Sequence, residues 1–318
     1  MLRKIFILIL ACLFLSPLIL FAENKAPAII VIKSLDIEPY RLALEGFKQG
    51  LNSQGIKAKY IEYSLEGDGS IQKEKIAQAF RDNTGDLILT IGSGATTFAK
   101  ENFKDRPIVF SMVLNPVASG FVSSLSGGSG GNITGAAMDV PLRRQFEVIK
   151  SSIPEIKRVV TFYNPKETQA LVPLVQGAAL SEGLSFKAIP VNSEKDMMDS
   201  LKQLVSKQDM LFAIADSKVY TPQNAQFIIL ETLRNGIPFV GISSAYVKAG
   251  ALLSFSCNFK ENGEQAAGLA ARILNGESPS KLSVAIPERI EIAINENTAR
   301  HIQIKLPERI LKEAAEVF

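Results

Sequence analysis

Several residue types are scarce in this sequence, and each scarcity excludes a class of site. The 318 residues include two cysteines, one histidine and no tryptophan. Two cysteines are too few for a disulfide framework or a thiolate zinc cluster. A single histidine, His301, leaves a metal ion or a catalytic base without the partners that such sites need, so we expect it on the surface. Without tryptophan, a sugar ring lacks one common stacking surface.

The charge pattern excludes two further classes of protein. The chain has 35 basic and 32 acidic residues, a formal net charge of +3, and charges of both signs interspersed. The sequence has no basic stripe of the kind that binds nucleic acid and no acidic run of the kind that forms a disordered tail. The hydrophobic fraction is 47%, and the length suffices for two domains, each with its own core.

The amino-terminal segment is typical of a secretory signal. Arg3 and Lys4 precede an apolar stretch, and Ala22 precedes a polar run. We predict a signal peptide over residues 1–22 and a mature protein that works in the periplasm or otherwise outside the cytoplasm. Two alternatives stay open, namely lipid attachment at Cys12 and an uncleaved membrane anchor, because the apolar run approaches spanning length.

Predicted strands and helices alternate along the rest of the chain. Short apolar runs rich in β-branched residues predict buried strands, and apolar residues at helical spacing predict helices between them. The predicted strands span residues 28–33, 57–63, 86–92, 107–113, 158–164, 185–191, 210–216, 238–243, 251–256, 281–287 and 290–295. The predicted helices span residues 40–54, 71–80, 95–103, 141–154, 167–182, 194–207, 222–236 and 261–276. The glycine-rich stretch 125–135 is predicted to be a loop.

This alternation predicts an α/β fold of two lobes, each a doubly wound parallel sheet covered by helices. The first crossing between the lobes is expected near Met138. The elements after residue 251 are too few for a third domain, so they are expected to complete both sheets through further crossovers.

Candidate ligand contacts follow the predicted strands, because ligands bind beyond the carboxyl ends of the strands in open parallel sheets. Tyrosine is common in these loops, and it suits a wet cleft with an apolar wall. Tyr40 has an alternative role at the start of a helix core stripe. The candidates are Asp36, Tyr40, Ser93, Gly94, Ala95, Thr96, Asn115, Tyr163, Asn164, Asp216, Tyr220, Ser243 and Tyr246.

Two of these places suggest opposite charges on the ligand. Residues 92–96, Gly-Ser-Gly-Ala-Thr, lead from an apolar strand into a helix N-terminus, whose free N–H groups suit a carboxylate or phosphate. The same residues also suit an ordinary tight turn, and they match neither a P-loop nor a dinucleotide fingerprint. Asp216 ends another apolar strand, where it could hold a ligand ammonium or cap N–H groups of its own loop.

No combination of residues indicates catalysis. The sequence around Ser243 lacks the second glycine of a nucleophile elbow. Cys257 has no histidine partner except His301, so a small buried side chain is the simpler role. We therefore expect a binding protein, not an enzyme, with no cofactor, no metal and no nucleic acid partner.

Four stretches of the sequence resemble one known family. They are FSMVLNPVASGFVSSLSGGSGGNITG, SSIPEIKRVVTFYNP, GALLSFSCNFKENGEQAAGLAARILNGESPSKLSVAIPE and IAINENTARHIQIKLP. They are similar to blocks of the ABC-transporter substrate-binding family that includes tryptophan- and tyrosine-binding proteins. The segment LSGGSGGNITG departs from that family's pattern before its paired glycines.

The resemblance implies a class I periplasmic-binding-protein fold with the ligand cleft between the lobes. Lobe one would comprise residues 27–138 plus 257–285, and lobe two residues 139–256 plus 286–318. The implied function is extracytoplasmic binding of a small amino acid-like, possibly aromatic, ligand by a monomer that delivers it to an ABC permease in the inner membrane. The alternative is a periplasmic sensor that signals through a membrane partner, because the fold serves both roles.

Overall fold

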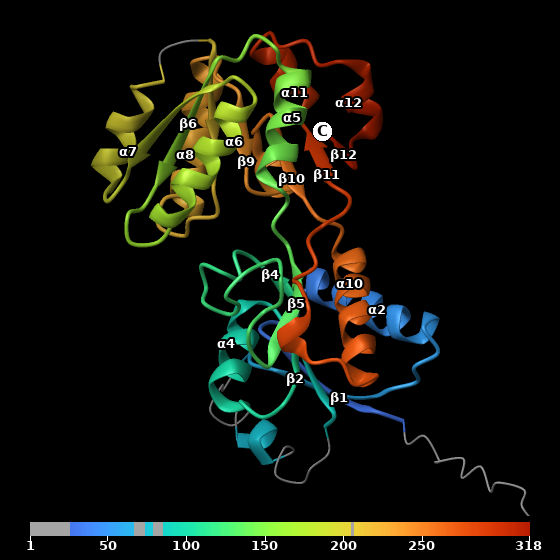
Figure 1. The fold of residues 1–318 in the computed structure, drawn as a ribbon. Coiled ribbons are helices and arrows are strands. Elements are labelled where there is room, and N and C mark those ends of the chain that lie inside the picture. Colours follow the sequence, from blue (N-terminus) through green and yellow to red (C-terminus); the bar gives the residue numbers. More distant parts are fainter. Residues whose placement is uncertain (1–25, 67–73, 79–84, 205–206) are drawn as a thin grey trace, which may run out of the picture.

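The computed structural model describes residues 26–66, 74–78, 85–204 and 207–318. The predicted signal peptide, its cleavage after Ala22 and lipid attachment at Cys12 lie outside these residues. Of the helix predicted over 71–80, residues 74–78 are described and are helical, and the rest lie outside the described residues. No helix in the described ranges is long and apolar enough to cross a membrane. Figure 1 shows two lobes with chain segments passing between them.

Lobe one is built on a five-stranded parallel sheet in the order β2-β1-β3-β4-β5. Helices cover both faces of this sheet, so the side chains of a strand alternate between two apolar clusters. On β1, Ile29 and Val31 pack in one cluster, and Ile30 and Ile32 in the other. The strands are β1 (Ala28–Lys33), β2 (Lys59–Ser64), β3 (Leu87–Ile91), β4 (Ile108–Val113) and β5 (Ile133–Ala137).

The longer helices of lobe one are α2 (Glu38–Ser53), α4 (Ser93–Asn102) and, from much later in the chain, α10 (Phe259–Leu274). Helices α2 and α10 lie side by side on one face of the sheet (Figure 1). Their backbones approach closely, because a Cβ on Gly263 would lie 1.9 Å from the carbonyl oxygen of Ala43. Glycine is therefore required at this crossing, and the late helix is integral to lobe one.

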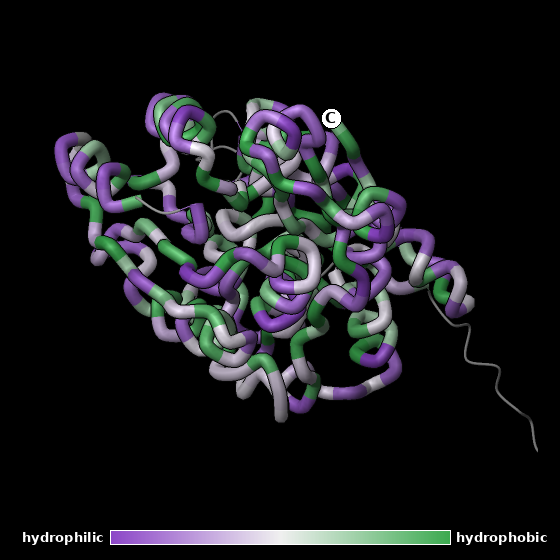
Figure 2. Tube along the Cα trace, turned by 90° about the horizontal axis from the view of Figure 1, so that it is seen from above, coloured by the Kyte–Doolittle hydropathy of each residue, from purple (hydrophilic) through white to green (hydrophobic). Residues whose placement is uncertain are grey.

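Lobe two is built on a seven-stranded sheet in the order β12-β11-β10-β9-β8-β6-β7, in which β10 and β11 are antiparallel and the other neighbours parallel. Its strands are β6 (Arg158–Tyr163), β7 (Ser185–Pro190), β8 (Asp209–Phe212), β9 (Phe239–Gly241), β10 (Leu253–Ser256), β11 (Glu291–Ile294) and β12 (Glu316–Val317). Its helices are α5 (Leu142–Ser152), α6 (Val172–Ser181), α7 (Glu194–Leu201), α8 (Pro222–Arg234), α9 (Ser244–Ala249), α11 (Glu296–His301) and α12 (Glu308–Glu313). Figure 2 shows hydrophobic and hydrophilic residues alternating along the helices, as expected where one face of a helix is buried.

The chain passes between the lobes at three places. These are the segments between β5 and α5, between β10 and α10, and between Ala285 and β11. Asn262 anchors the start of α10 to lobe one, where the second crossover ends. Its side-chain oxygen accepts the Ser111 hydroxyl and the Met112 N–H, and its amide group donates to the Ala137 carbonyl. The expectation of several crossovers is therefore met by the described chain.

Two sequence-based predictions of secondary structure are wrong. Residues 133–135 belong to β5 although they end the glycine-rich stretch predicted to be a loop. A Cβ on Gly135 would lie 2.2 Å from the carbonyl oxygen of Phe110 on β4, so glycine is needed inside this strand. Residues 281–287 form no strand beyond an isolated bridge between Ala285 and Ala136.

Candidate functional site

A cavity of about 700 Å³ lies between the two lobes. It opens at the carboxyl ends of strands from both sheets, where ligands bind in open α/β folds. Lobe one and the segments that leave it contribute Leu114, Asn115, Pro116, Val117, Ala118, Leu125, Met138, Asp139, Val140, Pro141 and Ile286. Lobe two contributes Leu142, Gln145, Ala170, Leu171, Leu174, Val175, Phe212, Ala213, Ile214, Ala215, Val240, Gly241, Ile242 and Phe255.

The walls of this cavity are apolar and exposed. Many of the large hydrophobic side chains that the described surface leaves exposed lie on them, and Leu174 is 59% exposed. The others on the walls are Leu114, Val117, Leu125, Ile242 and Ile286. Grouped exposed apolar side chains mark a binding surface, whereas single ones are ordinary. The cavity therefore suits a ligand with a substantial apolar body.

Asp139 is the one charged side chain among the described residues that line the cavity. It lies on the first crossover, and both of its carboxylate oxygens accept the N–H of Asn115, at 3.0 and 2.8 Å. Burial raises the pKa of Asp139 to about 6, against the lowering effect of the N–H bonds from Asn115 and from its own backbone. No lysine, arginine or histidine in the described chain forms an ion pair with it.

Asn115 links the end of β4 to this carboxylate. Its φ of +49° places it in the left-handed region, which asparagine tolerates better than most residues. The conformation turns the chain after β4 so that the Asn115 N–H points at Asp139 while the loop 114–118 borders the cavity. Sequence reasoning selected Asn115 but missed Asp139, because a lone aspartate between a glycine-rich stretch and a helix carries no motif.

The stretch 92–96 forms the start of α4, as the sequence predicted. Gly92 has φ +90°, and a Cβ there would lie 2.4 Å from the hydroxyl of Tyr40. Tyr40 is half-buried against the core of lobe one, so its side chain both packs as a core residue and reaches the turn. The close packing explains why glycine stands at position 92.

The residues that follow divide into two structural groups. Ser93 and Gly94 are exposed at the first turn of α4. Ala95 is buried and donates its N–H to the hydroxyl of Ser34 at 2.8 Å. Thr96 is buried, and its hydroxyl bonds the Gly92 carbonyl and the hydroxyl of Thr90, both at 2.9 Å. These residues do not line the large cavity, and a ligand contact at Ser93 stays a prediction.

Asp216 is buried in lobe two, and its carboxylate is occupied by its own surroundings. One oxygen accepts the Asn164 N–H at 2.7 Å and the Thr168 hydroxyl at 2.5 Å. The other accepts the N–H groups of Lys218 and Val219, at 3.0 and 2.9 Å. These contacts match the loop-capping alternative, and the ammonium role stays a prediction.

Three of the selected tyrosines pack against lobe-two cores. Tyr163 packs against one core cluster there. Tyr220 is buried and stacks on Phe239 at 6.4 Å between ring centroids, and burial raises its pKa above the usual range. Tyr246 is half-buried and donates its hydroxyl hydrogen to the Tyr220 carbonyl at 3.1 Å. None of the three lines the large cavity. Ser243 stands at the N-cap position of α9, where its side chain makes no capping hydrogen bond.

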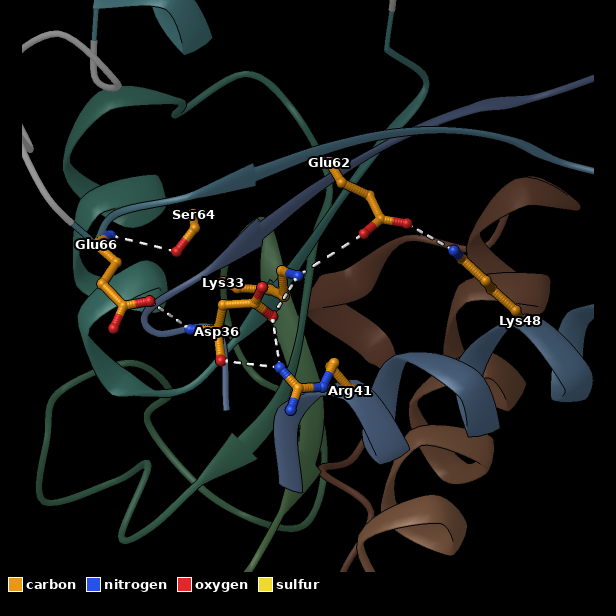
Figure 3. Close-up of polar contacts among 7 residues, drawn as sticks. All are labelled: Lys33, Asp36, Arg41, Lys48, Glu62, Ser64 and Glu66. Carbon is orange, nitrogen blue, oxygen red and sulfur yellow. Dashed lines mark hydrogen bonds and ion pairs between the residues drawn. The ribbon is translucent and has the colours of Figure 1, made fainter. Parts of the chain in front are cut away.

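Asp36 belongs to a charged cluster at the end of β1 (Figure 3). Its carboxylate lies 3.0 Å from the ammonium of Lys33 and 3.5 Å from the guanidinium of Arg41. Hydrogen bonding to Lys33 holds the pKa of Asp36 below its usual value. Lys33 in turn lies 3.8 Å from Glu62, which also pairs with Lys48. The charges in this cluster compensate one another, and Asp36 does not line the cavity.

A smaller cavity of about 320 Å³ lies within lobe two, beside the carboxyl ends of β6 and β7. Asn164 lines it, and the Asn164 side-chain amide donates to the Val191 carbonyl at 3.1 Å. The other polar side chains that line it are those of Asn192, Ser193, Lys218, Thr221, Gln223 and Asn224. It is bounded by one lobe only, unlike the larger cavity.

Metal-binding side chains do not cluster in the described residues. No group of three or more histidine, cysteine, aspartate or glutamate side chains there could hold a metal ion. His301 is exposed at the end of α11, as predicted. Cys257 is buried, and burial raises the pKa of its thiol to about 12, so it remains an unreactive thiol near neutral pH.

Two α/β lobes joined by three crossovers around an apolar cavity define a two-lobed binding protein. The chain belongs to the ABC transporter substrate-binding protein family, because the model of that family matches residues 28–318. It is therefore a substrate-binding protein of an ABC transporter and not an enzyme. Its periplasmic-binding-protein fold is the one that the sequence predicted.

Known relatives are distant in sequence but similar in fold. A tyrosine-binding protein of Clostridioides difficile is 24% identical over 268 residues, which cover 83% of this chain and 77% of that protein. The structure of an ABC domain with L-Trp from Streptococcus pneumonia covers 92% of this chain and 100% of its own, with a TM-score of 0.68 at 23% identity. The ligand-free, open structure of a Clostridium difficile substrate-binding protein with adhesive properties covers 92% and 99%, with a TM-score of 0.77 at 23% identity.

Proposed function

We propose that this protein binds a small amino acid-like ligand with an apolar or aromatic side chain in the cavity between its lobes. It then delivers this ligand to a membrane permease. The observation that carries the proposal is the cavity itself, which has walls from both lobes, mostly apolar lining and a single carboxylate. A volume of about 700 Å³ lies within the usual range for small-molecule sites.

The relatives support the same ligand class. One is a tyrosine-binding protein, and another structure contains L-Trp. Both ligands combine an aromatic body with a polar amino acid end, which fits apolar walls around a few polar groups. The three crossovers supply a hinge, and closing the lobes would bring the exposed apolar walls against the ligand.

Calorimetry with a panel of L-amino acids tests the proposal. We expect aromatic or large aliphatic amino acids to bind and small polar ones not to bind. Ala215→Phe, on an exposed part of the cavity wall, should weaken binding about tenfold or more by occupying ligand space. Ala315→Phe introduces the same side chain at an exposed position away from the cavity and should leave binding unchanged. If no amino acid of the panel binds, the proposed ligand class is wrong.

A separate measurement addresses the carboxylate end of the ligand. Ser93 lies outside the cavity lining but is exposed at the first turn of α4, where N–H groups and a hydroxyl could hold an anion if closure of the lobes brings the ligand to it. Ser93→Ala should then weaken amino acid binding by removing one charge-assisted bond, about 1.5–3 kcal/mol. Normal binding by this variant would leave the loop as a structural turn only.

A further inference from the structure

We propose that Asp139 is the site that receives the cationic amine of the ligand, so that the cavity selects apolar molecules carrying a primary ammonium group. This inference rests on the proposed function and deepens it. The sequence-based prediction placed the ammonium at Asp216, whereas the cavity geometry points to a different carboxylate.

The position of Asp139 is the first argument. Its side chain lines the cavity on the first crossover, and every other charged side chain in the described chain lies off the cavity wall. The remaining polar side chains on the wall are those of Asn115 and Gln145, and the Gln145 amide already donates to the Val140 carbonyl at 2.9 Å. An ammonium group entering the cavity therefore has one anionic partner.

The second argument is the incomplete compensation of this carboxylate. Asp139 accepts N–H bonds from the Asn115 backbone but has no cation within ion-pair distance among the described residues. Asp139 is partly buried, and a carboxylate that has lost part of its hydration without gaining an opposite charge is destabilised. Asp216, in contrast, accepts four local hydrogen bonds and lies off the cavity. A ligand ammonium would thus stabilise Asp139 more than Asp216.

The titratable groups on the other two crossovers do not compete with Asp139 for the ligand ammonium. Cys257, on the second crossover, interacts electrostatically with Asp139, but burial raises the pKa of its thiol to about 12 and keeps it neutral. Glu291, near the third crossover, bonds the Asn258 side chain at 2.7 Å. The third crossover also carries a cation, Arg289, but its guanidinium pairs with Glu261 at 3.2 Å. Among the described residues, the crossovers therefore supply no cation that pairs with Asp139.

The location on a crossover adds a consequence for closure. Asp139 is joined to the loop after β4 through Asn115 on one side, and it leads directly into α5 of lobe two on the other. An ammonium bound here contacts the segment that must move when the lobes close. Recognition of the amine would thereby shift the equilibrium between open and closed lobes toward the closed state. Such a shift requires that the ligand bind the closed state more tightly than the open one.

The test compares Asp139→Asn with the parent protein by calorimetry. Asparagine keeps an oxygen that can accept the Asn115 N–H but removes the charge. The probes are L-phenylalanine, L-tyrosine and L-tryptophan, with 3-phenylpropionate as the deaminated counterpart of phenylalanine. Asp86→Asn is the matched control, because Asp86 also accepts a backbone N–H, that of Ala28 at 2.7 Å, but lies off the cavity.

We expect Asp139→Asn to weaken the binding of amine-bearing probes by about 30-fold or more, from the usual cost of removing one partner of a desolvated charge pair. Binding of 3-phenylpropionate should not weaken, and Asp86→Asn should behave like the parent. Below pH 6 the carboxylate must release its proton to pair with the amine, so parent affinity should fall up to about tenfold per pH unit. The asparagine variant should lose this pH dependence.

Two results would overturn the inference in distinguishable ways. If the parent binds an amino acid and Asp139→Asn binds it equally well, Asp139 is not the amine site, while the proposed function stands. If the parent binds none of the amino acids, the proposed function fails, and phenethylamine and tyramine then serve as probes. Binding of these amines by the parent but not by Asp139→Asn would support the inference, and no binding by the parent would end it.

Discussion

Replacing Asp216 by alanine is the sharpest test of its structural role. The change removes the acceptor of four hydrogen bonds at 2.5 to 3.0 Å, three from backbone N–H groups and one from the Thr168 hydroxyl. Each bond to a charged group is worth about 1.5–3 kcal/mol, and a buried donor left without a partner costs about 1–3 kcal/mol. Asp216 as a whole residue is 2% exposed, so water does not replace the carboxylate freely.

The four costs do not add fully. The Val219 N–H and the Thr168 hydroxyl bond Asp216 in buried surroundings, whereas the N–H groups of Asn164 and Lys218 are partly buried and water can reach them. We therefore expect Asp216→Ala to lower the free energy of unfolding of lobe two by about 2–4 kcal/mol, mainly through the two buried donors.

Urea denaturation followed by far-UV circular dichroism measures this loss, since the chain has no tryptophan for fluorescence. Asp199→Ala is the control, because Asp199 is 54% exposed and pairs only with Lys202 on the surface of α7. That variant should change the free energy by no more than about 0.5 kcal/mol. The reasoning is refuted if Asp216→Ala loses less than about 1 kcal/mol. If its stability is kept while amino acid binding disappears, Asp216 holds the ligand instead.

Three further changes have expected outcomes. Gly263→Ala should destabilise lobe one by about 2 kcal/mol or more in denaturant titration, because its Cβ would lie 1.9 Å from the Ala43 carbonyl oxygen. Gly268→Ala is the control, because position 268 has open space around it and alanine there should be neutral or stabilising. The folded protein keeps the proton of Asp139 up to about pH 6 while the unfolded chain releases it near pH 4, so stability should fall as pH rises between these values. The difference in denaturant midpoint between the parent and Asp139→Asn, measured across this pH range, isolates the effect. A difference that does not change with pH would contradict it. Cys257 should resist iodoacetamide at pH 8 in the native protein and react in 6 M urea, because burial raises its pKa to about 12; rapid native labelling would show that the thiol is accessible.

The sequence predicted the fold class well because the signal is repeated many times. Buried strands such as β1 and β3 are almost entirely apolar, and helices such as α2 and α5 show one apolar face. The failure at β5 has a local cause. Glycine at position 135 fits a loop by composition, and only the close approach of β4 reveals why a strand needs it there.

The cavity was harder to predict than the sheets. The search of strand ends selected Asn115, which lines the cavity. The same rule also selected Tyr220 and Tyr246, which pack in the core of lobe two. A loop position does not fix the direction of a side chain. Sequence reasoning did not select Asp139, because its place on the cavity wall depends on apolar residues that lie far away in the sequence.

The late position of α10 in the chain has a consequence for biosynthesis. One face of the lobe-one sheet is covered by Ala266, Ala267 and Ala270 of this helix together with α2. The ribosome completes β1 to β5 and then all of residues 139–256 before α10 emerges. During that interval the nascent amino-terminal half displays an unfinished apolar surface, a target for holding chaperones and a source of aggregation. A fragment ending at residue 256 should accordingly be collected in the insoluble fraction, whereas adding residues 257–285 should restore a soluble lobe one.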